Sequence, residues 1–156
     1  MSPEHAPISL TLERLWQFSF QYYSVRDVKD AGLALQNQFH GNVNLLLLLK
    51  WLDEQQLSFA EEGWHKVQQC LSRSETLLHN FRELRKHLKP QVVDSLYREA
   101  LQFELQLEKQ QQSDLVDCIN SLHLAANQQS QLAFEYCRLL GVENLYDAFS
   151  EPAPQP

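Results

Sequence analysis

The chain has 156 residues, a length that fits one domain whose core is large enough to need no disulfide or metal support. Its net charge of −7 argues against binding to nucleic acid or to an anionic membrane surface, because both need clustered positive charge. Three cysteines at distant positions, Cys70, Cys118 and Cys137, indicate a reducing compartment rather than a disulfide framework, so we expect a cytoplasmic protein.

Residue choice predicts helix throughout. The chain contains 28 Leu against 12 Val, Ile and Thr together, and only one proline, Pro90, lies in its long central part. Leu loses little rotamer freedom in a helix, whereas β-branched residues favour strands. We therefore expect an all-α, single-domain helical bundle of about six or seven helices over residues 9–150. A flexible arm is predicted at 1–8 and a disordered proline-rich tail at 151–156.

The first predicted helix begins at a Ser9 or Thr11 cap and ends near Tyr23. Its bulky apolar stripe is best explained by core packing, with a ligand-stacking surface as the alternative. A second helix is predicted from Asp27 to Phe39, and Gly41 is expected to end it in a left-handed conformation.

The third predicted helix starts from an Asn42 cap and covers Val43 to about Leu52. It is apolar on nearly every side, which is typical of a central helix surrounded by others. Lys50 and Asp53 bracket the apolar run, which is far shorter than the roughly 20 residues that a bilayer requires. We therefore predict a buried leucine-rich helix and no membrane span.

Two further helical segments are predicted before the proline. The capping-box pattern Ser58-Phe59-Ala60-Glu61 predicts a helix that runs to Leu71, and Ser72 or Ser74 permits a kink or a restart. The next segment, Glu75 to Lys89, is expected to end at Pro90.

A heptad seam follows, at Val93, Leu96, Ala100, Phe103 and Leu107. The run Gln110–Gln112 interrupts the seam, and Ser113 can cap a new helix that ends at Gly141. Two long antiparallel helices are therefore expected over 91–140, with one bent helix as the alternative. A short turn of helix is predicted at 143–149.

Polar residues crowd the junction between the second and third helices, and Asn44 stands inside the apolar helix. A buried amide without a partner costs about 1–3 kcal/mol, so Asn44 must be satisfied. One hypothesis is a hydrogen bond to the backbone end of the second helix. The other is a ligand pocket lined by Trp16, Tyr23, Gln36, Asn44 and Trp51.

Basic residues recur at intervals of three and four on the helix before the proline: Arg82, Arg85, Lys86 and Lys89. One interpretation is a solvated face paired with acids on the neighbouring helix, which would bring Arg82 near Glu99. The other is a docking face for an acidic protein partner or a phosphate-bearing ligand.

No catalytic or phosphate-binding motif is present. A di-iron bundle needs two Glu-x-x-His pairs, and only Glu62 with His65 matches. We therefore predict no catalytic residues, no metal ligands and no cofactor, and we lean toward a protein that is not an enzyme.

Several segments resemble the signature of a short, uncharacterised proteobacterial family of all-helical proteins. They are Trp16 with Tyr23, Leu33–Gln36, Gly41 leading to Val43–Leu47, Trp51, Leu84-Arg85 with Lys89, and Glu104–Glu108. The segment Val25–Asp27 departs from the family, which tends to have a Pro-Gly turn there. The resemblance implies a bacterial cytosolic protein and carries no catalytic residues across.

Together these features predict a non-catalytic cytoplasmic adaptor or regulator that binds an unknown protein partner through its basic face or its long helices. The alternative is a small-ligand-binding or enzymatic helical bundle with a polar and aromatic pocket near Asn44. Self-association as a homodimer is a further alternative.

Overall fold

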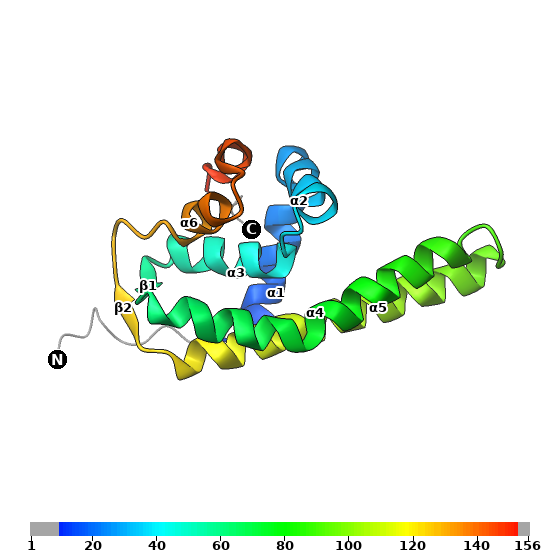
Figure 1. Cartoon of the computed structure of the whole chain (residues 1–156), viewed down its shortest axis with the longest axis horizontal. Helices are drawn as coiled ribbons and strands as arrows, with labels where there is room; N and C mark the ends of the chain where they lie inside the picture. Colours follow the sequence, from blue (N-terminus) through cyan, green and yellow to red (C-terminus); the bar gives the residue numbers. More distant parts are fainter. Residues whose placement is uncertain (1–9, 153–156) are drawn as a thin grey trace.

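The computed structural model describes residues 10–152 as seven helices and one two-stranded sheet (Figure 1). The elements are α1 (Leu12–Tyr23), α2 (Arg26–Gln38), α3 (Val43–Glu54), β1 (Leu57–Phe59), α4 (Glu62–Leu88), α5 (Asp94–Ser121), β2 (Leu124–Ala126), α6 (Leu132–Leu139) and η2 (Glu143–Phe149). The predicted helical fold is confirmed, with a small sheet that was not expected. The arm predicted at 1–8, and all but the first two residues of the tail predicted at 151–156, lie outside the described residues.

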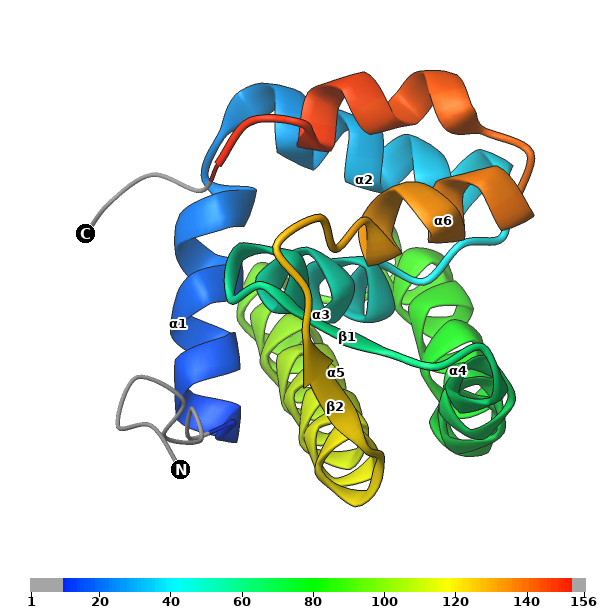
Figure 2. The same cartoon turned by 90° about the vertical axis from the view of Figure 1, so that its left-hand side faces the viewer.

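The buried central helix is also confirmed. Figure 2 shows α3 in the middle of the body, with α1 beside it, α2 and α6 above it and the α4–α5 hairpin below it. The Asn42 side chain caps α3 by accepting a hydrogen bond from the Leu45 amide at 2.9 Å, and every residue from Asn44 to Leu52 is buried. No helix within residues 10–152 is both long enough and apolar enough to cross a bilayer.

The turn between α2 and α3 differs from the prediction. The left-handed residue is His40, with a φ of 59°, and not Gly41. Gly41 is instead needed for space, because a Cβ atom there would lie 2.5 Å from the Cγ atom of Leu35. This close approach lets the start of α3 pack directly against α2.

The prediction of a helix that begins at Ser58 was wrong. Leu57–Phe59 forms β1, which pairs antiparallel with β2, and α4 begins only at Glu62. The Phe59 ring is buried against α4, where its centroid lies 5.2 Å from that of Trp64 and where a Cβ atom on Gly63 would be 2.7 Å from it. Burial of this ring takes precedence over the local capping pattern.

Both long helices are continuous, so the helix does not restart at Ser72 or Ser74, and the break predicted at Gln110–Gln112 was wrong. The Ser72 hydroxyl donates to the carbonyl oxygen of Gln69 within the same helix at 2.8 Å. The interruption falls later, between Ser121 and Leu132, where β2 pairs with β1. The region 91–140 is therefore one long helix, a strand and a short helix.

The start of α6 is held by a residue distant in sequence. The Asp53 carboxylate accepts hydrogen bonds from the Leu132 amide at 2.8 Å, the Ala133 amide at 3.0 Å and the Ser130 hydroxyl at 2.7 Å. Amides at a helix N-terminus have no partner within the helix, and a carboxylate there also favours the helix dipole. Asp53 thus joins the end of α3 to the start of α6.

The α4–α5 hairpin extends well beyond the body as an arm (Figure 1). Its helices meet along an apolar seam of eight residues: Leu77, Phe81, Leu84 and Leu88 on α4, and Leu96, Ala100, Phe103 and Leu107 on α5. The Phe81 and Phe103 rings pack with centroids 5.1 Å apart. Leu77, Leu84 and Phe103 nevertheless remain 61%, 51% and 50% exposed, because two helices alone cover only one side of the seam.

Candidate functional site

A groove of about 430 Å³ lies between α1, α2, α3 and the α4–α5 hairpin. Seven large apolar or aromatic side chains line it: Trp16, Phe20, Tyr23, Leu33, Val43, Leu47 and Leu105. Its polar lining comes mainly from Ser19, Gln36, Asn44, Arg82, Arg85, Glu104, Glu108 and Gln112. Apolar walls with a few placed polar groups are the usual make-up of a small-molecule site.

Four of the five residues predicted for a pocket line this groove: Trp16, Tyr23, Gln36 and Asn44. Tyr23 reaches it because Gly32 leaves room, since a Cβ atom at Gly32 would lie 2.9 Å from the Tyr23 ring. Trp51 does not line the groove and is only 4% exposed in the core. It lies seven residues beyond Asn44 on the same helix, which displaces it by roughly 10 Å along the axis.

The floor of the groove, at Asn44 and Gln112, is part of a buried amide network that also includes Asn42 and Gln111. The Asn44 amide donates to the Gln111 side-chain oxygen at 2.9 Å and to the Glu108 carbonyl at 3.3 Å. The Gln112 amide donates to the Asn44 oxygen at 3.2 Å and to the Ser19 hydroxyl at 3.0 Å. Asn44 is therefore satisfied by α5, and not by the backbone end of α2 as one hypothesis held.

The network continues away from the groove. The Asn42 amide donates to Gln111 at 3.2 Å, and Gln111 donates to the Ser74 hydroxyl on α4 at 2.9 Å. The sequence did offer a signal for the two glutamines. Each stands four positions before an apolar residue of α5, Leu115 or Val116, so helical spacing places both on its buried face.

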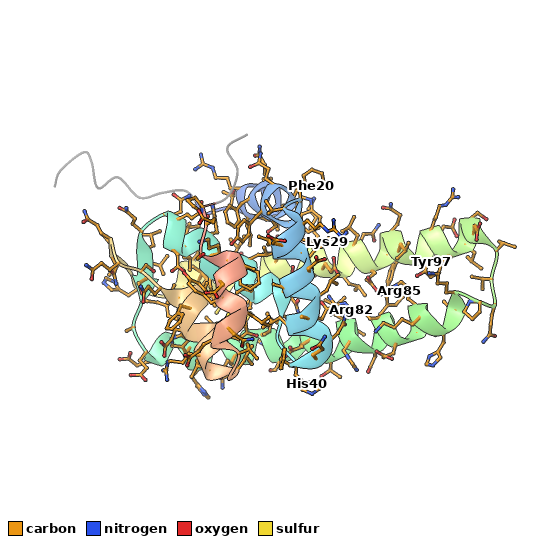
Figure 3. All side chains as sticks on the ribbon, turned by 90° about the horizontal axis from the view of Figure 1, so that it is seen from above. Phe20, Lys29, His40, Arg82, Arg85 and Tyr97 are labelled. Carbon is orange, nitrogen blue, oxygen red and sulfur yellow. The ribbon has the colours of Figure 1, made fainter. Side chains whose placement is uncertain are left out.

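The two arginines of the predicted basic face point into the hairpin, along the strip between α4 and α5 that Figure 3 shows from above. Arg82 pairs with Glu108 at 3.2 Å and Arg85 pairs with Glu104 at 2.7 Å, and all four side chains are mostly buried. The prediction that Arg82 lies near Glu99 was wrong. Glu99 is exposed and lies about 140° around α5 from Glu104, at 100° per residue.

Burial dominates the acid–base chemistry of the groove. It raises the pKa of Glu108, although the neighbouring Arg82 guanidinium opposes that effect. Burial, aided by the negative charge of Glu108, also raises the pKa of Tyr23 to about 12. The Tyr23 hydroxyl is therefore neutral near pH 7 and available as a hydrogen-bonding group.

The two lysines of the basic face lie elsewhere. Lys86 is exposed, pairs with Glu83 at 3.4 Å and lines a second cavity. The Lys89 ammonium lies 5.8 Å from the centroid of the Tyr97 ring, near the tip of the arm. The four basic residues therefore do not form one continuous docking face.

The second cavity, of about 540 Å³, lies between the end of α2 and α4. Most of the polar residues at the junction after α2 line it, namely Gln36, Asn37, His40 and Asn42. Gln36 and Arg82 line both this cavity and the groove. Apart from Gly41, the residues that line this cavity are polar or charged. Across residues 10–152, no three His, Cys, Asp or Glu side chains are grouped so as to hold a metal ion.

Comparison with known proteins gives one match. Residues 14–115 match a family model described as a protein of unknown function, DUF2390. No curated protein and no solved structure matches the chain. The matched region contains all of the groove residues, and it ends just before the last part of α5.

Proposed function

Because this chain belongs to the DUF2390 family of proteins of unknown function, we propose a function for it from the groove itself: non-catalytic binding of a small, uncharged and largely apolar molecule. The resemblance noted in the sequence is confirmed by the family match, since residues 14–115 include every residue that carries it. Residence in the cytoplasm is part of the same proposal and is supported by three free thiols.

The observation that carries the proposal is the meeting of four pocket residues predicted from sequence in one groove of suitable size. Ligand sites usually range from about 300 to 1,000 Å³. Phe20 is 78% exposed at the groove and Trp16 lies beneath the Lys109 ammonium, 5.5 Å from the ring centroid. The exposed Phe20 ring and the partly buried Trp16 ring favour a ligand with a flat apolar part.

The charges of the groove favour an uncharged ligand. Arg82 and Arg85 are already neutralised by Glu108 and Glu104, so an anion would have to displace a carboxylate that is mostly buried. The floor offers hydrogen bonds instead. Within residues 10–152, Gln112 Oε1 is the buried side-chain oxygen or nitrogen that lacks a hydrogen bond, and Gln112 lines the groove, so this oxygen is a candidate acceptor for a ligand hydroxyl or N–H.

The test is a fluorescence titration of the full chain with N-phenyl-1-naphthylamine, an uncharged aromatic probe with one N–H group. We expect saturable binding to one site. Phe20→Ala should weaken it about tenfold, because one aromatic contact contributes about 1.4 kcal/mol. The control is Leu139→Ala, an exposed apolar residue outside the groove, which should bind like the wild type.

A negatively charged probe tests the preference of the groove for uncharged ligands. The sulfonated probe 8-anilinonaphthalene-1-sulfonate has similar rings and a negative charge, and we expect it to bind more weakly than the uncharged probe. Tighter binding of the sulfonate would contradict the preference for uncharged ligands. Equal effects of Phe20→Ala and Leu139→Ala would contradict the location of the site.

A second candidate function is protein binding through the apolar seam, and we propose that the partner is a second copy of this chain. The half-exposed side chains of the seam present several hundred Å² of apolar surface, on the scale of the roughly 800 Å² that each partner gives to a stable interface. The adaptor function expected from the sequence thus remains a proposal, moved from the basic face to the seam.

Self-pairing is favoured by the symmetry and the charges of the arm. A two-fold axis along the arm would lay α4 of one copy on α5 of the other and bury both seams in a four-helix bundle. It would also bring the exposed His87 at the edge of one copy's α4 toward the exposed Glu99 at the edge of the other copy's α5. Such edge pairs set orientation more than affinity.

Light scattering after size-exclusion chromatography tests this second candidate. We expect the wild type to have the mass of two chains and the double variant Leu84→Glu with Phe103→Glu to have the mass of one. The matched control is Leu101→Glu, because Leu101 is exposed on the same helix but faces away from Phe103, and it should stay dimeric. A wild-type mass of one chain would refute dimerisation through the seam.

A further inference from the structure

Two of the three cysteines meet across the base of the hairpin. The Cys70 thiol on α4 donates to the carbonyl oxygen of Asp114 at 3.3 Å, and the Cys118 thiol on α5 donates to that of Lys66 at 3.7 Å. Asp114 stands four residues before Cys118, and Lys66 stands four residues before Cys70. Each sulfur therefore points at the helical turn that precedes the other cysteine, which places the two thiols on facing sides of the same helix pair.

Small molecules have access to this pair. Both cysteines line a cavity of about 510 Å³ and are partly exposed, whereas Cys137 is fully buried in the core. Two basic residues, Lys66 and Arg73, and two acidic residues, Asp114 and Asp117, also line the cavity. The pair is therefore set apart from the third cysteine by position and by access.

The two thiols are not equivalent. Burial raises the pKa of Cys70 to about 11. Burial also raises the pKa of Cys118, but the nearby Cys70 thiol and the charges of Lys66 and Arg73 oppose that rise. Cys118 is therefore the thiol that loses its proton more readily, and the thiolate is the reactive form.

We propose that Cys70 and Cys118 form a reversible disulfide that links α4 to α5 when the protein meets a hydroperoxide. The Cys118 thiolate attacks one peroxide oxygen, which breaks the O–O bond and gives a sulfenic acid and hydroxide. The Cys70 sulfur then attacks the Cys118 sulfur, and the S–O bond breaks with loss of water. The cysteines together lose two electrons, the peroxide gains them, and an excess of a small thiol reverses the link by exchange.

The experiment uses the full chain, treated with hydrogen peroxide, alkylated and digested for mass spectrometry. We expect a peptide pair joined through Cys70 and Cys118, an intact mass lower by two hydrogens, and full reversal by dithiothreitol. Cys137→Ser should leave the linked pair unchanged. Cys70→Ser should abolish it and leave a sulfenic acid on Cys118 that dimedone traps.

Three outcomes would overturn the proposal, and none depends on how the variants fold. They are a gain of oxygen at Cys118 of the wild type without any linked pair, a link that includes Cys137, and a link between two chains. Binding of the uncharged probe in the groove is measured separately and does not depend on this result.

Discussion

Gln111→Ala is expected to lower the free energy of unfolding by about 3–5 kcal/mol, which combines a cavity with lost hydrogen bonds in the core. Gln111 accepts hydrogen bonds from Asn42 and Asn44 and donates one to Ser74. Its removal leaves the Asn42 amide and the Ser74 hydroxyl without these partners at a site that is only 1% exposed. The midpoint of thermal unfolding should fall by roughly 10 °C for a chain of this size.

Urea denaturation measures the effect, and the neighbouring glutamine provides the control. Gln110 is exposed, and its amide bonds only Asp114 on the same helix at 3.0 Å, so Gln110→Ala should change the stability by less than about 0.5 kcal/mol. Equal losses in the two variants would mean that helix propensity, and not the amide network, governs this part of α5.

Gly41→Val is expected to cost about 3 kcal/mol or more, because the added side chain overlaps Leu35 and Leu140 in a packed core. The atoms that it meets are 2.5 Å and 3.0 Å from the position of the new Cβ atom. Either α2 or α3 must move to make room, which would also disturb the Asn42 cap. Thermal and urea unfolding of the variant measure the loss.

Gly141→Ala separates lack of space from backbone conformation. Gly141 has a φ of +75° and no atom within 4 Å of an added Cβ, so alanine should cost only about 1 kcal/mol from the left-handed backbone. Equal, small losses of stability in Gly41→Val and Gly141→Ala would contradict the tight packing of α2 against α3 at Gly41.

The parts of the fold that follow from local sequence were predictable. Asn42 caps α3, Thr11 caps α1, and the leucine-rich helix is buried as its all-round apolarity indicates. Trp16, Tyr23, Gln36 and Asn44 line one groove because they lie on three neighbouring helices near the same junction. These features depend on caps and on periodicity, which a single sequence records.

The parts that failed depend on partners distant in sequence. Ser58 begins a good capping pattern, but Phe59 is buried in a strand because β2 lies beside it. The glutamine run looks like a break, yet it holds Asn42 and Asn44 across more than 60 residues. The meeting of Cys70 and Cys118 likewise requires the hairpin register, which spacing along the chain does not supply.

α5 is one unbroken helix that joins the arm, the groove and the thiol pair. The helix contains no glycine or proline from Asp94 to Ser121 and is on the order of 40 Å long. Its outer third carries Phe103 of the seam, its middle carries Glu108 and the floor of the groove, and its inner end carries Cys118. Because one unbroken helix carries all three features, a substitution that displaces α5 is expected to alter the arm, the groove and the thiol pair together.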